Sequence, residues 1–219
     1  VFGKASGFSA GINLSSLDGN NGFRLDGVAS FAGLYGYLGF SVSTAGDVNG
    51  DGFDDLIAGA PGMDPNGSSS GSSYVVFGKS SGFGASIEVS SLDGANGFRL
   101  DGVTVQDNSG MSVSGAGDVN GDGFDDVIVG AHGADPNGSY SGSSYVVFGK
   151  QSGFNASMKL SSLDGSNGFR LNGETEKDFS GWSVSTAGDV NGDGFDDVFV
   201  GTNAENPNGG NLGLSYVVF

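Results

Sequence analysis

The chain contains the nonapeptide Asp-Val-Asn-Gly-Asp-Gly-Phe-Asp-Asp three times, at residues 47–55, 118–126 and 189–197. Successive copies begin 71 residues apart. Alternate residues of a tight loop can point to the same side, and carboxylate, amide and backbone carbonyl oxygens are the ligands that Ca²⁺ prefers in proteins. The nonapeptide therefore predicts a repeat array with one calcium site in each repeat. Calcium, as three ions, is the expected cofactor.

The predicted ligands occupy the first, third, fifth, seventh and ninth positions of each nonapeptide. The seventh residue would contribute its backbone carbonyl, and the Gly before it allows the chain to turn sharply over the ion. The predicted ligands are Asp47, Asn49, Asp51, Phe53 and Asp55; Asp118, Asn120, Asp122, Phe124 and Asp126; and Asp189, Asn191, Asp193, Phe195 and Asp197. The eighth-position aspartates, Asp54, Asp125 and Asp196, are expected to lie outside the ligand set, beside a ligand or in solvent.

The alternative interpretation of the nonapeptide is an acidic turn without a metal, because Asn-Gly and Asp-Gly dipeptides mark turns in many proteins. Three identical copies at one spacing favour the metal site. Magnesium is a weaker candidate because it requires stricter octahedral geometry and keeps more of its water. Zinc fits poorly, since the chain has no Cys and His132 is its one His.

The sequence around each nonapeptide is typical of β-strands and not of an EF-hand, which would have Glu at position 12, where this chain has Ala58, Val129 and Val200. Apolar and polar residues alternate before the loop, and a β-branched run ending in Gly follows it. Four strand-like pieces recur: 39–43, 110–114 and 181–185; 55–58, 126–129 and 197–200; 74–79 and 145–150; and 22–27, with copies from 97 and 168. A further stretch, at 12–17, 87–92 and 158–163, is predicted as a short added strand or an ordered loop.

Four antiparallel strands in each repeat, a period above 40 residues and 44 glycines predict an all-β fold of β-propeller blades. A β-helix is the alternative, but its repeats are far shorter. The whole chain, 1–219, is predicted to be one repeat array with units 5–75, 76–146 and 147–217, whose boundaries lie inside a strand. About four to eight blades are needed to close a propeller. Three blades therefore predict part of a larger ring or assembly, completed by self-association or by further blades of a longer chain.

The composition restricts the class of partner and the location. The formal net charge is −17, and the surface would stay acidic with three calcium ions bound, which argues against nucleic acid and anionic membranes as partners. No stretch is long and apolar enough to insert into a membrane as a helix. Weak calcium cages are typical of extracellular modules. We therefore expect a secreted or cell-surface protein.

The sequence contains no set of residues that predicts catalysis. Ser is abundant, but His132 is the single His and no second base is placed beside a nucleophile. Paired carboxylates occur inside the predicted calcium loops, where the metal would occupy them. We expect a non-enzymatic protein in which His132, at the position that Pro61 holds in the first repeat, belongs to a loop or turn. Trp182 aligns with Phe40 and Met111 and is predicted to pack in a blade core, with an exposed, sugar-stacking position as the alternative.

Residues 53–61, Phe-Asp-Asp-Leu-Ile-Ala-Gly-Ala-Pro, together with a downstream Val-Phe-Gly, resemble the FG-GAP repeat. That repeat builds the seven-bladed propeller of integrin α subunits and occurs in bacterial surface and secreted proteins and in some fungal lectins. The resemblance covers nearly the whole chain as three blades. It implies that the calcium loop joins the first two strands of a blade on the lower face, in agreement with the strand pattern.

The resemblance also implies where a protein or glycan ligand would bind. In integrin-like propellers the upper face, opposite the calcium loops, binds ligands. The corresponding loops here are 29–38, 104–109 and 174–180, with 62–73, 133–144 and 204–214. The expected function is adhesion or protein recognition by a calcium-binding propeller module. A subunit of an extracellular filament or sheath, built by head-to-tail blade pairing, and a glycan-binding lectin are the alternatives.

Overall fold

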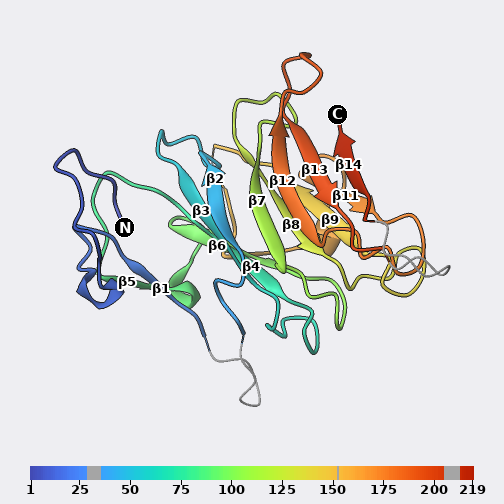
Figure 1. Cartoon of the computed structure of the whole chain (residues 1–219), viewed down its shortest axis with the longest axis horizontal. Coiled ribbons are helices and arrows are strands. Elements are labelled where there is room, and N and C mark those ends of the chain that lie inside the picture. Colours follow the sequence, from blue (N-terminus) through green and yellow to red (C-terminus); the bar gives the residue numbers. More distant parts are fainter. Residues whose placement is uncertain (29–35, 152, 205–212) are drawn as a thin grey trace.

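The computed structural model describes residues 1–28, 36–151, 153–204 and 213–219 and shows an all-β chain whose sheets stand side by side (Figure 1). The first sheet is built on β2 (Val42–Gly46), β3 (Asp55–Ala60), β4 (Ser72–Val76) and β6 (Gly97–Asp101). The second contains β7 (Ser112–Gly117), β8 (Asp126–Ala131), β9 (Ser143–Val147) and β11 (Gly168–Asn172). The third contains β12 (Ser183–Gly188), β13 (Asp197–Gly201) and β14 (Ser215–Val218).

The strands named here pair antiparallel with their neighbours within each sheet, which confirms the prediction of propeller-like blades. The innermost strands β2, β7 and β12 lie next to each other. The Ser41 hydroxyl accepts a hydrogen bond from the Val113 N–H at 3.1 Å, and the Ser112 hydroxyl accepts one from the Val184 N–H at 3.0 Å. The blades are therefore fixed to each other along their inner edges.

The observed strand bounds differ from the predicted ones for local reasons. The first strand begins at Val42 instead of residue 39, because Gly39 has a φ of +85° and belongs to a turn. The third strand ends at Val76 instead of residue 79. Beyond it, the Gly78 N–H donates to the Asp55 carboxylate at 2.7 Å and no longer takes part in the sheet ladder.

The further stretch of the second and third repeats pairs with a strand of the preceding blade. In two copies it forms a short strand and one 3₁₀ turn, namely β5 (Ser86–Glu88) with Val89–Ser91 and β10 (Ser157–Lys159) with Leu160–Ser162. The first copy contains the 3₁₀ turn Leu14–Ser16. β5 pairs in parallel with β1 (Arg24–Asp26), and β10 with β6. β5 and β10 thus each add one parallel strand beside the outer strand of the preceding blade.

The hydrophobic core lies between the blades. Ile57, Val75 and Phe98 of the first blade pack in one cluster with Val113 and Val129 of the second. A second cluster joins the second blade to the third, and contains Ala116, Ile128, Val146, Val184, Val198 and Val200. Since these side chains are buried by a neighbouring blade, stability belongs to the array and not to a single repeat.

Candidate metal centres

Each nonapeptide connects the first two strands of a sheet, between β2 and β3, β7 and β8, and β12 and β13. This is the position that the strand pattern predicted. The strand register shifts by one residue just before the loop, between Thr44 and Gly46 in the first copy. Gly46 has a φ of +73° there, so the shift aims the chain away from the ladder and into the loop.

The first loop is closed by its own side-chain oxygens. Asp47 Oδ1 accepts a hydrogen bond from the Asp51 N–H at 3.0 Å, and Oδ2 accepts one from the Gly52 N–H at 2.8 Å. Asn49 Oδ1 accepts from the same Asp51 N–H at 2.9 Å. The carboxylate of Asp47 and the amide oxygen of Asn49 therefore lie together inside one turn. The second and third loops repeat these hydrogen bonds.

The ninth residue of each nonapeptide is a buried aspartate that anchors the loop. Asp55 accepts from the Val48 N–H at 3.0 Å and from the Gly78 N–H at 2.7 Å. Burial, with a smaller contribution from the nearby Asp51 and Asp47, raises the pKa of the Asp55 carboxyl to about 7 despite these two donors. Burial likewise raises the pKa of Asp126 to about 7. A cation next to these carboxylates would offset both effects.

The predicted ligands fit a hard cation in chemistry, but the structure does not arrange them as a finished cage. Within the described part of the chain, no three Asp, Glu, His or Cys side chains converge in a group that could hold a metal ion. Their oxygens instead accept hydrogen bonds from backbone N–H groups of the loop. The four predicted side-chain ligands of each loop surround one turn and offer oxygen atoms, which suits Ca²⁺ better than Zn²⁺.

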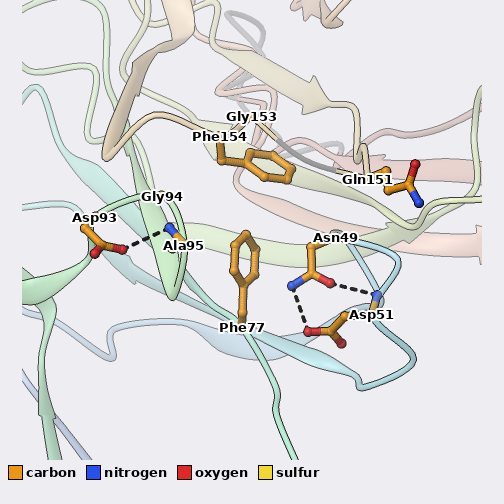
Figure 2. A pocket seen from close by; sticks show the side chains of 9 residues that line it. All are labelled: Asn49, Asp51, Phe77, Asp93, Gly94, Ala95, Gln151, Gly153 and Phe154. Atoms are coloured by element: carbon orange, nitrogen blue, oxygen red, sulfur yellow. Dashed lines mark hydrogen bonds between the residues drawn. The ribbon is translucent and has the colours of Figure 1, made fainter.

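The first loop can be reached from solvent through a pocket. It has a volume of about 480 Å³ and is lined by Asn49 and Asp51 on one side and by Asp93 on another. Figure 2 shows the rings of Phe77 and Phe154 between these polar groups. A cation therefore has an open path to the exposed carboxylate of Asp51.

Two of the eighth-position aspartates, Asp125 and Asp196, hold the preceding loop, a contact that the sequence does not predict. The carboxylates of Asp125 and Asp196 accept hydrogen bonds from the N–H groups of Asp47 and Asp118, each in the preceding loop, at 2.7 and 3.0 Å. Both carboxylates therefore contact a neighbouring loop instead of standing free in solvent. The recurrence of Asp at the eighth position of every copy could have indicated this contact. The backbone N–H that each carboxylate accepts from, however, lies 78 residues earlier in the chain.

The opposite end of the blades carries an aromatic cluster. The ring of His132 packs edge-on against Trp182, with ring centroids 4.9 Å apart, and Phe179 stacks with Tyr140 at 5.5 Å. The prediction that Trp182 lies in a blade core is wrong, because this side chain is 41% exposed. Trp182 precedes the first residue of β12, so its side chain lies at the end of the sheet. His132 is in a turn, as predicted.

Among the described residues, no helix has the length and apolar character needed to cross a membrane.

Comparison with known proteins agrees with the blade pattern. The FG-GAP repeat model matches residues 38–76, 109–147 and 180–218, which together make up more than half of the chain. Each match begins three or four residues before the first strand of a blade and ends at the last residue of the third.

Integrin alpha chains are among the similar proteins. The chain is 29% identical to chicken (Gallus gallus) integrin alpha-6 over 171 residues, 30% identical to chicken integrin alpha-V over 188 residues, and 31% identical to Xenopus laevis integrin alpha-4 over 172 residues. These alignments cover 77–83% of this chain but 14–16% of each relative. The chain thus corresponds to a small part of a long protein in each case. From its three matched repeats, the chain belongs to the FG-GAP repeat family.

Proposed function

We propose that this chain is a calcium-binding, non-enzymatic propeller module of a secreted or cell-surface protein, and that it mediates adhesion or protein recognition. One observation carries the proposal. In three FG-GAP repeats, an identical oxygen-rich turn is anchored by a buried aspartate between the first two strands of a blade. The similarity to integrin alpha chains supports the adhesive role.

Calcium would be held by the first, third, fifth and ninth side chains of each nonapeptide and by the carbonyl of the seventh residue. When bound, the ion would supply two positive charges to a turn that contains three carboxylates. The loop backbone positions these groups, because glycines at the fourth and sixth positions have φ angles between +70° and +93°. The buried ninth residue ties the turn to the blade.

The proposed recognition surface is the loop face opposite the calcium loops. Its loops are joined in pairs by backbone hydrogen bonds, as from the Asn108 N–H to the Ser69 carbonyl at 3.0 Å and from the Phe179 N–H to the Tyr140 carbonyl at 2.9 Å. A surface held in this way loses little conformational entropy on binding a ligand. Of the predicted ligand loops, residues 29–35 and 205–212 lie outside the described residues.

Further blades are the proposed structural partners. In the described residues, the third sheet has three strands where the first two sheets each have a fourth outer strand of the same type. Blades of a longer chain, or a second copy of this chain, would complete it. The filament alternative requires such pairing to propagate head to tail instead of closing a ring.

The proposal predicts that the protein binds three calcium ions, measured by isothermal titration calorimetry. Replacing the exposed fifth-position ligand, as in Asp51→Ala, Asp122→Ala or Asp193→Ala, should remove one ion each, and the triple variant should bind none. Asp93→Ala, which removes a carboxylate that lines the same pocket as Asp51 but lies outside the nonapeptide, is the control and should leave three ions. Unchanged stoichiometry in the triple variant would show that the nonapeptides are ordinary acidic turns.

The aromatic cluster favours glycan binding as a second candidate function. Tyr140 and Trp182 are exposed, and Tyr140 and Phe179 have φ angles of +55° and +50°, a conformation that costs non-glycine residues energy. Strain of this kind is often retained where side chains serve a binding site. Exposed ring faces of this sort can stack on sugar rings.

A glycan array tests this second function. If the cluster binds sugar, the wild-type chain should give signals that fall at least about tenfold in Trp182→Ala, as expected for the loss of about 1.4 kcal/mol of stacking. Met111→Ala, at the same position of the preceding repeat, is the matched control and should retain the signal. An array without signal for the wild-type chain would exclude the lectin and leave protein recognition.

A further inference from the structure

The first calcium loop is held by the loop of the following repeat. The Asp47 N–H donates to Asp125 Oδ2 at 2.7 Å, and the Asp125 N–H donates back to the Asp47 carbonyl at 3.2 Å. The ring of Phe124 lies over Gly50 so closely that a Cβ there would clash with it. Residues 124–125 of one loop therefore clamp residues 47–50 of the loop before it.

The same clamp joins the second and third loops. The Asp118 N–H donates to Asp196 Oδ2 at 3.0 Å, the Asp196 N–H donates to the Asp118 carbonyl at 3.1 Å, and the ring of Phe195 covers Gly121. Two independent junctions thus share every element of the contact. A chance surface contact would not be reproduced in this way.

The third loop provides an internal comparison. Among the described residues, nothing lies within 4 Å of a Cβ placed on Gly188 or Gly192, which correspond to the covered Gly46 and Gly50. The second residue of the loop shows the difference: Val48 is 1% exposed, whereas Val190 is 58% exposed. Within this chain, the loops therefore differ in support although their sequences are identical.

We propose that neighbouring calcium sites are energetically coupled through the eighth-position aspartates, with Asp125 joining the first site to the second and Asp196 joining the second to the third. The inference rests on the proposed function, since it requires that the loops bind calcium. The route is short. Phe124 would bind the second ion through its carbonyl, and the next residue, Asp125, holds both backbone polar groups of Asp47, a ligand of the first ion.

Such coupling is positive, meaning that each ion strengthens the binding of the other, and it is reciprocal. Calcium in the second loop would fix residues 124–125 and so order Asp47 before the first ion arrives, which lowers the entropy cost of binding that ion. By linkage, the first ion must strengthen the second site by the same factor. Asp125 and Asp196 are thus positioning residues, which act on an ion bound by other side chains.

The test uses the full chain with two sites at a time. In an Asp193→Ala background, the first two loops should bind calcium cooperatively in isothermal titration calorimetry, with the second step about tenfold tighter than for independent sites. Adding Asp125→Ala should make the two steps independent. Asp125→Asn keeps an acceptor oxygen and should restore part of the cooperativity. Asp54→Ala is the matched control, because in the described structure no preceding loop lies beside Asp54, and it should change nothing.

Hydrogen exchange gives a readout that does not need calcium. The Asp47 and Asp118 amides should be protected in the metal-free chain and the Asp189 amide should exchange freely, and Asp125→Ala should expose Asp47 alone. If Asp125→Ala does not fold, by circular dichroism, Asp196→Ala in an Asp51→Ala background tests the other junction.

The outcomes separate the two proposals. Cooperativity that is lost in Asp125→Ala and kept in Asp54→Ala would support the coupling. Independent binding of two ions in the Asp193→Ala background, or cooperativity that Asp125→Ala leaves unchanged, would overturn the coupling and leave calcium binding intact. Absence of any calcium binding by the unsubstituted chain would overturn the proposed function, and the coupling with it.

Discussion

In excess chelator, the chain should melt about 15–30 °C below its melting temperature in millimolar calcium. A site at 100 times its dissociation constant adds about 2.7 kcal/mol to the free energy of unfolding, so three sites would add about 8 kcal/mol. For a chain of 150–250 residues, each kcal/mol shifts the melting temperature by about 2–4 °C. Because whole domains are stabilised by about 5–15 kcal/mol, calcium would contribute a large part of the total.

The physical reason for this effect lies in the turns. Without a cation, each loop keeps three carboxylates around one turn, one of them buried and with its pKa raised to about 7 in the first two loops. Differential scanning calorimetry in calcium and in excess EGTA measures the shift. Magnesium at the same concentration is the control for ionic strength and should restore little of the loss. Superimposable curves in calcium and EGTA would contradict the prediction.

Asp126→Ala should lower the free energy of unfolding of the metal-free chain by about 2–4 kcal/mol. The Asp126 carboxylate accepts from the Val119 N–H at 3.0 Å and from the Gly149 N–H at 2.8 Å, and it is fully buried. Its removal leaves two N–H groups without their partner, at about 1–3 kcal/mol each. Relief of the desolvation that raises the pKa of Asp126 offsets part of this loss.

Urea unfolding in EGTA isolates this effect from the loss of a metal site. Asp122→Ala is the first control, since it removes an exposed predicted ligand of the same loop and should change the metal-free stability by less than about 0.5 kcal/mol. Asp197→Ala is the second. In the described residues its carboxylate accepts from one backbone donor, the Val190 N–H at 2.7 Å, so the loss should be about half that of Asp126→Ala. Equal stability of all three variants would refute the anchoring role.

The local chemistry could be predicted from the sequence because it is carried by residues close together in the chain. Asp47, Asn49 and Asp51 lie within one turn, and the pattern of apolar and polar residues around that turn specifies two strands on any backbone. The fold class followed from the 71-residue period and the four strand-like pieces of each repeat, which are also local patterns. His132 could be placed in a turn from its alignment with Pro61.

The tertiary structure decided what depends on contacts between repeats. The further stretch could be a strand or a loop until β10 was seen to pair with β6, a strand of the preceding blade. Trp182 resembled a core residue, but it stays 41% exposed, because His132 of the preceding blade covers only part of its ring. Identical loops also differ in their surroundings, because Asp125 supports Asp47 from 78 residues away, while nothing in the described chain supports Asp189 in that way. A local pattern specifies a turn and its donor atoms, whereas burial and long-range hydrogen bonds arise when separate repeats pack together.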